Sequence, residues 1–328
     1  MRYYNEIIRR TAQDIIHGDY VNSSIVKLLA VVLAWPIVAL AIIQVYQWYQ
    51  EATYVRVVEP LSQERVQHPI YFQFAQEALD SYGKLPKGDR QILKDQLRKV
   101  IVPVDVWMER LNRSNIGTVC LGESHDDHNR RFLTENFFPS YDLDTLFVET
   151  TPQGLAQIHD YMKAGEIYAP LLGADMGHLL DAVMARNPTV KIQGIEESEQ
   201  QREDRLERRK GSREDSIYEN LKLLYNANER NVVLYGALHC TFDPDKLYQR
   251  MREGLGGGTV TYQSILVQGA HQDGLMETFV YFLDDIGIIP GDFVITDAQA
   301  LPPWVRENFQ WLWAQTLANY QSVVVYKP

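Results

Sequence analysis

The stretch Ile116-Gly117-Thr118-Val119-Cys120-Leu121-Gly122-Glu123-Ser124-His125 decides the predicted fold, because a short apolar run ends in a turn with acidic and imidazole side chains. Val232-Val233-Leu234-Tyr235-Gly236-Ala237-Leu238-His239 repeats this order, so that both runs end in a G-x-x-H motif. In a chain that alternates strands and helices, such runs are parallel strands, and ligand sites form at the carboxyl ends of parallel strands. We therefore expect His125 and His239 to meet in one crevice.

The sequence around these stretches alternates between strand-like and helix-like patterns. Amphipathic segments such as 215–227 and 305–320 predict helices between the apolar runs. This order predicts an α/β fold over residues 115–328, with a mostly parallel sheet flanked by helices on both faces. The predicted strands span 116–121, 145–148, 190–194, 232–235, 260–267, 293–295 and 323–326.

Composition indicates a folded chain with an acidic balance. The 328 residues are 45% hydrophobic, which suffices for a full core. The net charge of −11 argues against a nucleic-acid partner, since phosphate binding needs a concentrated basic face. The basic run at 202–213 is interleaved with acidic residues and indicates a solvated helical face. The glycine triplet 256–258 indicates a flexible turn, because neither Lys-Ser/Thr nor a helix start follows it.

An apolar segment near the N-terminus predicts a membrane anchor. Residues 28–43 carry no charge, and the whole segment 25–49 is long enough to cross a hydrocarbon core about 30 Å thick. Basic residues precede it and acidic residues follow it, which predicts a single-pass protein with a cytoplasmic segment 1–24 and a periplasmic or extracellular C-terminal domain. The alternatives are a signal peptide cleaved near Ala39-Leu40-Ala41 and a buried core helix.

Residues 50–114 change to an amphipathic pattern. Segments 71–79 and 91–111, the latter interrupted at Pro103, carry apolar residues at helical spacing. We interpret 50–114 as a helical linker that packs on the α/β domain. This segment contains no evident catalytic or ligand-binding motif.

Ionisable side chains gather after four of the predicted strands. They are Glu123, His125, Asp126, Asp127 and His128 after the first, Glu149 after the second, Glu196 and Glu197 after the third, and His239 after the fourth. Each alone is also typical of a helix cap or a surface charge, but together they share one edge of the sheet. His159, His178 and His271 have no comparable context and are interpreted as structural or surface residues.

Two cysteines accompany the motifs. Cys120 lies two residues before Gly122, and Cys240 follows His239. Buried free thiols are the favoured interpretation, because cysteine is a common small core residue. If the two strands are neighbours, a disulfide or a thiolate ligand is the alternative.

Several of these motifs resemble the superfamily that joins erythromycin esterase-like proteins, ChaN-like haem-binding proteins and the TraB/Tiki proteins. Leu121-Gly122-Glu123-Ser124-His125-Asp126 looks like the G-E-x-H-D opening of ChaN-like members, and Gly236-Ala237-Leu238-His239 like the second G-x-x-H. Leu146-Phe147-Val148-Glu149 resembles the second strand with its terminal glutamate. Arg213-Glu214-Asp215-Ser216-Ile217-Tyr218-Glu219-Asn220 is similar to the R-D-x-x-M-A-x-N helix start, with an extra residue after Arg or a Glu in the Asp place. The likeness covers roughly residues 115–240.

This resemblance implies one of three activities: metal-dependent hydrolysis as in the Tiki group, metal-independent hydrolysis as in the esterases, or haem binding without catalysis. Under the first, His125, Glu149 and His239 are the metal ligands for Mn²⁺, Co²⁺ or Zn²⁺, with a position open for water. Glu123 is then a general base or a further ligand.

Without a metal, His125 paired to Glu123 activates water, and Arg213 stabilises the oxyanion. In either case His128, Glu196 and Glu197 are candidate supporting residues beside the site.

We therefore expect a membrane-anchored hydrolase of a peptide or ester bond that acts outside the cytoplasm and uses a divalent metal. The first alternative is a haem- or metal-binding uptake protein, which predicts an apolar, aromatic-lined cleft. The second is a scaffold subunit of a membrane complex with a decayed site, against which the intact set of Glu123, His125, Glu149 and His239 argues.

Overall fold

The computed structural model describes residues 69–164, 175–208, 211–255, 260–270, 272–289 and 291–327. Segment 1–24, the expected anchor 25–49, the triplet 256–258 and His271 lie outside these residues, as does the side chain of His159. Among the helices that are described, none is long and apolar enough to cross a membrane. Residues Gln67–Pro328 form one compact unit, to which the described part of the expected linker belongs.

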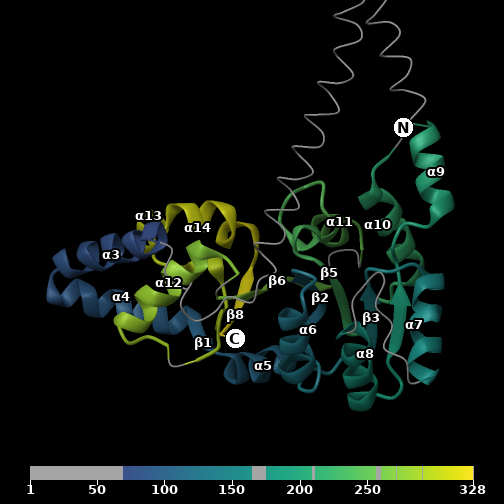
Figure 1. Ribbon diagram of the computed structural model, residues 1–328, viewed down its shortest axis with the longest axis horizontal. Coiled ribbons are helices and arrows are strands. Elements are labelled where there is room, and N and C mark those ends of the chain that lie inside the picture. The colour runs from purple at the N-terminus through teal and green to yellow at the C-terminus, as the bar shows by residue number, and fades with distance from the viewer. Residues whose placement is uncertain are drawn as a thin grey trace, which may run out of the picture. The chain divides into compact units, whose positions relative to one another are not determined.

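An eight-stranded sheet organises the described residues (Figure 1). Its order is β1-β7-β8-β6-β2-β5-β3-β4. The six strands from β8 to β4 pair in parallel, whereas β7 is antiparallel to both β8 and β1. The strands are β1 (Ile101–Pro103), β2 (Ile116–Glu123), β3 (Thr145–Val148), β4 (Lys191–Gly194), β5 (Asn231–Gly236), β6 (Thr261–Gly269), β7 (Phe293–Ile295) and β8 (Ser322–Tyr326). The predicted mostly parallel α/β sheet is confirmed.

Helices cover both faces of this sheet, because successive strand residues point to opposite sides and both sides are apolar. Cys120 and Val233 belong to one core cluster, and their neighbours Val119 and Val232 belong to the other. The first face is packed by α3 (Pro69–Lys84), α4 (Lys87–Val100), α10 (Arg213–Leu224), α11 (Leu247–Gly254), α12 (Gly274–Asp285), α13 (Pro303–Asn308) and α14 (Gln310–Gln315). The second is packed by α5 (Val104–Arg113), α6 (Asp127–Phe132), the π-helix η2 (Leu133–Phe137), α7 (Pro152–Ala164) and α8 (Asp175–Arg186).

Two expected helices are interrupted. Within 91–111 the chain forms β1 between α4 and α5, since Ile101 and Val102 bury their side chains on opposite faces of the sheet. Pro103, which has no N–H to donate, ends this edge strand. Within 305–320, Phe309 adopts a non-helical backbone between α13 and α14, and its ring packs against Phe279 with ring centroids 5.0 Å apart.

The remaining short elements lie near the carboxyl ends of strands or connect helices. They are the charged helix α9 (Glu199–Arg208) and the 3-10 turns η3 (Ala237–Cys240), η5 (Ala298–Ala300) and η6 (Leu317–Asn319). The basic run 202–213 was expected to be a solvated helical face. Arg202 on α9 is exposed as expected, but Arg213 at the start of α10 contacts the candidate site described below.

The expectation of free thiols is wrong, because Cys120 and Cys240 form a disulfide. Cys120 lies in β2 and pairs in register with Val233 of β5. After β5 the chain turns into η3, which folds back over the end of β2 and brings Cys240 within a Cα–Cα distance of 5.4 Å from Cys120. Both cysteines are fully buried.

Candidate active site

The site lies at the carboxyl ends of four neighbouring strands, in the order β2, β5, β3 and β4. Each strand is followed directly by one or more of the ionisable residues that the sequence predicted. β2 ends at Glu123 and is followed by His125, β3 is followed by Glu149, β4 by Glu196, and β5 by His239 on η3. Because these strands are parallel neighbours, the four loops come together at one edge of the sheet.

The glycines of the two motifs make room for each other. A Cβ on Gly122 would lie 2.9 Å from the Cα of Ala237, inside the second motif. A Cβ on Gly236 would lie 2.7 Å from Nε2 of His125, inside the first. Each G-x-x-H motif therefore fits closely against the other, which explains why glycine occupies the strand end in both.

His125 is held between two carboxylates. Its Nδ1 lies 2.9 Å from Oε1 of Glu123, and its Nε2 lies 3.1 Å from Oε2 of Glu149. The backbone at His125 has a φ of 57°, in the left-handed region that few non-glycine residues adopt, and this turns the ring back over the strand ends. Hydrogen bonds to Glu123 and then to Glu149 outweigh burial and raise the pKa of His125 to about 9. At neutral pH the ring is an imidazolium.

A buried ion pair between Arg130 and Glu123 lies on the interior side of His125. The guanidinium of Arg130 on α6 donates hydrogen bonds to Glu123, with Nη2 3.1 Å from Oε1. Both side chains are only 2% exposed. The sequence analysis did not identify Arg130, because an arginine seven residues after Glu123 follows no motif that marks it as its partner.

Glu149 contacts three other groups of the site, which are His125, the backbone of Gly236 and Arg213. Its Oε2 accepts hydrogen bonds from His125 and from the backbone N–H of Gly236 at 2.8 Å, and its Oε1 accepts one from Nη2 of Arg213 at 2.7 Å. Burial raises the pKa of Glu149, but the hydrogen bonds from His125, Gly236 and Arg213 together lower it to about 2. Glu149 is therefore an anion at any physiological pH.

Arg213 bridges Glu149 and Glu196 from the start of α10. Nε and Nη2 donate to the two oxygens of Glu196 at 2.9 and 2.6 Å, and these hydrogen bonds raise the pKa of the guanidinium further above its usual range. Ser212 and Asp215 form a capping box that fixes the first turn of this helix. The remaining nitrogen, Nη1, faces Nε2 of His239 at 3.4 Å.

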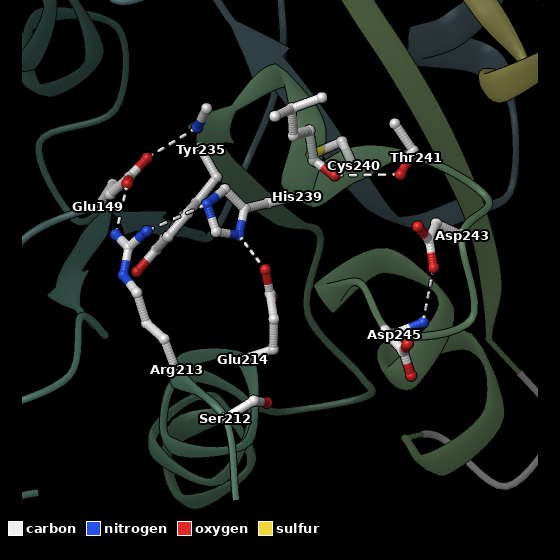
Figure 2. A network of polar contacts seen from close by, with 12 residues as sticks. Glu149, Ser212, Arg213, Glu214, Tyr235, His239, Cys240, Thr241, Asp243 and Asp245 are labelled. Atoms are coloured by element: carbon white, nitrogen blue, oxygen red, sulfur yellow. Dashed lines mark hydrogen bonds and ion pairs between the residues drawn. The ribbon is translucent and has the colours of Figure 1, made fainter. Parts of the chain in front are cut away.

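His239 is paired with a glutamate that the sequence analysis did not single out. Nδ1 of His239 lies 2.6 Å from Oε1 of Glu214, the residue after Arg213 (Figure 2). Figure 2 shows the imidazole of His239 between Glu214 and the guanidinium of Arg213. The carboxylate thus lies beside Nδ1, and Nε2 is the ring nitrogen that faces Arg213. The His239 ring also packs edge-on against Tyr235, with ring centroids 5.2 Å apart.

The other predicted residues lie outside this cluster. Glu197 binds Arg205 of α9, with the carboxylate 2.8 and 2.9 Å from Nε and Nη2, and also accepts a hydrogen bond from Ser216. Of the adjacent pair it is therefore Glu196 that faces the crevice. His128 and His178 are exposed on α6 and α8.

The arrangement does not fit a divalent cation held by His125, Glu149 and His239. Both ring nitrogens of His125 contact carboxylates, so neither nitrogen faces an open position for a metal. The guanidinium of Arg213 contacts both Glu149 and His239, where the cation would have to sit. Within the described part of the chain, no group of three or more His, Cys, Asp and Glu side chains has a metal-binding arrangement.

The site also does not fit the apolar, aromatic-lined cleft that a haem would need, because its centre is formed by charged side chains of Glu149, Glu196 and Arg213. An aromatic-lined cavity exists between α3, α12 and the α13–α14 pair. Its lining includes Phe74, Phe309 and Trp311 but no histidine to ligate iron.

Comparisons with known proteins leave the family open. No family model matches the chain, and no curated protein matches it. A solved structure described as "Crystal structure of bacterial protein toxins" is similar over 58% of this chain with 14% sequence identity and a TM-score of 0.32. This chain spans 42% of the length of that one. At this level the likeness carries no argument about function.

Proposed function

We propose that the protein is a hydrolase of a peptide or ester bond that activates water with His239 and works without a metal. The observation that carries this proposal is the row Glu214, His239, Arg213, in which a carboxylate oxygen lies 2.6 Å from Nδ1 of an imidazole and a guanidinium nitrogen lies 3.4 Å from its Nε2. Nucleophile activation by an oriented base beside an electrostatic stabiliser is the arrangement that acyl transfer needs.

In this mechanism water binds beside Nε2 of His239. Nε2 accepts a proton as the water oxygen attacks the substrate carbonyl carbon, and Glu214 stabilises the resulting imidazolium. Nη1 of Arg213 carries two N–H groups; one faces Nε2 of His239, and the other donates a hydrogen bond to the developing oxyanion. His239 then gives its proton to the leaving alkoxide or amine, which restores the neutral ring.

His125 has a different role from the water activation that the sequence suggested. Because both of its nitrogens face carboxylates and its pKa is raised to about 9, it is a poor base at neutral pH. It acts as a positioning residue, since it holds Glu149, which in turn holds Arg213. Glu123 and Arg130 anchor His125 from the buried side.

We further propose that this domain works outside the cytoplasm, tethered by the segment 25–49. The disulfide Cys120–Cys240 supports this location, because such bonds form and persist in oxidising compartments. The net charge of −11 also leaves peptide or ester substrates favoured over nucleic acid.

The test is hydrolysis of a panel of carboxylic esters and peptides by the full chain in detergent. His239→Ala and Glu214→Gln are compared with His178→Ala, which changes an exposed histidine on α8. We expect kcat to fall by about 10²–10⁴-fold in His239→Ala and by a smaller factor in Glu214→Gln, with His178→Ala unchanged. Wild-type hydrolysis that survives His239→Ala would overturn the proposal, as would a wild-type protein inactive on the whole panel.

A further inference from the structure

The disulfide joins the two motifs on their buried side. Cys120 is two residues before the glycine of the first motif, and Cys240 directly follows the histidine of the second. The bond connects β2 to η3, whose two last residues are His239 and Cys240. Any displacement of Cys240 therefore moves the neighbouring His239.

Hydrogen bonds from β6 and from the residues around η6 also hold η3, which packs against β2, β5 and α11 as well. Ser264 of β6 donates a hydrogen bond to the carbonyl of Cys240, and the hydroxyl of Tyr320 donates one to the carbonyl of Ala237 at 2.9 Å. The backbone N–H of Phe242 donates to the carbonyl of Asn319 at 3.0 Å. The disulfide supplies the covalent link to β2, the strand that carries Glu123 and leads into His125.

We propose that the Cys120–Cys240 disulfide is a positioning lock for His239, so that oxidation of the two thiols completes the active site. This inference rests on the proposed hydrolase function. Closing the bond removes two protons and two electrons from the thiols and transfers them to a disulfide oxidant, such as oxidised glutathione, which becomes two thiols. A dithiol reductant reverses the reaction.

The disulfide changes the position of the His239 ring, while the ring itself is present in both redox states. A displacement on the order of 1 Å at a catalytic group costs about 10²-fold in rate. His239 stands 3.4 Å from Arg213 and 2.6 Å from Glu214, so movement of η3 changes both distances together. Because both cysteines are fully buried, the folded oxidised protein resists reduction, and the lock is set when the chain first folds and oxidises.

The test compares three forms of the full chain: the oxidised wild type, the wild type unfolded and refolded with dithiothreitol, and a Cys120→Ala/Cys240→Ala variant. Thiol labelling followed by mass measurement verifies the redox state. The control is Leu180→Ala, a buried change in α8 on the opposite face of the sheet, which lowers stability without touching η3. Measurements are made where circular dichroism shows every form folded.

We expect kcat to fall at least tenfold in the reduced and cysteine-free forms with little change in KM, while Leu180→Ala keeps its kcat. Amide hydrogen exchange over residues 237–242 should speed up in the same two forms and not in Leu180→Ala. Reoxidation with glutathione disulfide should restore the wild type but not the variant.

Unchanged exchange at 237–242 in the reduced and cysteine-free forms would overturn the lock even if no substrate is found, because exchange is measured without activity. Full kcat in either form would also overturn it. An oxidised wild type that shows the slow exchange but hydrolyses nothing would instead refute the proposed hydrolase and leave the lock as a structural finding.

Discussion

Gly236→Ala should separate the two motifs. The added Cβ would lie 2.7 Å from Nε2 of His125 and 3.4 Å from Oε2 of Glu149. Since ordinary contacts begin near 3.4 Å, the imidazole must move by about 0.7 Å, which breaks its 3.1 Å contact with Glu149. Overpacking of this kind costs about 1–3 kcal/mol of stability, and the 40% exposed side chain of His125 can swing outward, which favours the lower end.

The clearest readout is the titration of His125. In the wild type its pKa is raised to about 9 by Glu123 and Glu149, so loss of the second partner should move the pKa toward the ordinary 6.5. NMR of the histidine ring protons across pH 5 to 10 follows this change, and urea unfolding follows the stability. Gly291→Ala is the matched control, because its Cβ would meet nothing within 4 Å. A pKa of His125 in Gly236→Ala equal to that of the wild type would refute the interlocking of the motifs.

Three further predictions concern stability. Arg130→Ala should lower the free energy of unfolding by about 3 kcal/mol, measured in urea, because buried Glu123 loses its guanidinium partner and keeps only the contact with His125; a loss under 1 kcal/mol would contradict the buried pair. The contact between His125 and Glu149 should stabilise the fold fully between about pH 4.5 and 6.5. The stabilisation is lost in acid as Glu149 is protonated near its lowered pKa of about 2, and it is lost in alkali as His125 is deprotonated near its raised pKa of about 9. Glu149→Gln should flatten both slopes of the unfolding free energy against pH, and slopes equal to those of the wild type would contradict the pairing. Removal of the disulfide, which spans 120 residues, should cost about 5 kcal/mol by the chain-entropy argument, and thermal unfolding at unchanged Tm would contradict it.

Strong local patterns predicted much of the fold. Seven strands appeared as apolar runs because both faces of the sheet are buried, which leaves a nearly continuous hydrophobic stretch. β1 was missed because a three-residue strand next to Pro103 leaves too short a pattern, and its partner β7 is almost 200 residues away in sequence. The break at Phe309 was missed because the apolar spacing continues across it and tertiary packing of its ring decides the backbone.

The site was predicted in its residues but not in its pairings. Strand ends placed His125, Glu149, Glu196 and His239 together, because the geometry of a parallel sheet follows from the order of its elements. Which carboxylate faces which imidazole depends on side-chain directions that no spacing in the sequence records. The sequence therefore placed Glu214 in the helix-start motif after Arg213 but gave it no partner.

The disulfide was missed for a related reason. Buried cysteines have the same local pattern whether they are free or bonded, and only the return of η3 over β2 brings Cys240 to Cys120. The flanking of both motifs by cysteines was the one signal in the sequence that favoured a bond.

The central claim is that Glu214, His239 and Arg213 hydrolyse their substrate without a metal. The most direct measurement is kcat of the full chain on its best ester or peptide substrate after exhaustive treatment with a chelator, with bound metal quantified in the same sample. The account predicts an unchanged kcat in protein that holds less than about one metal per hundred chains. Loss of activity on chelation that one equivalent of Mn²⁺, Co²⁺ or Zn²⁺ restores would contradict it.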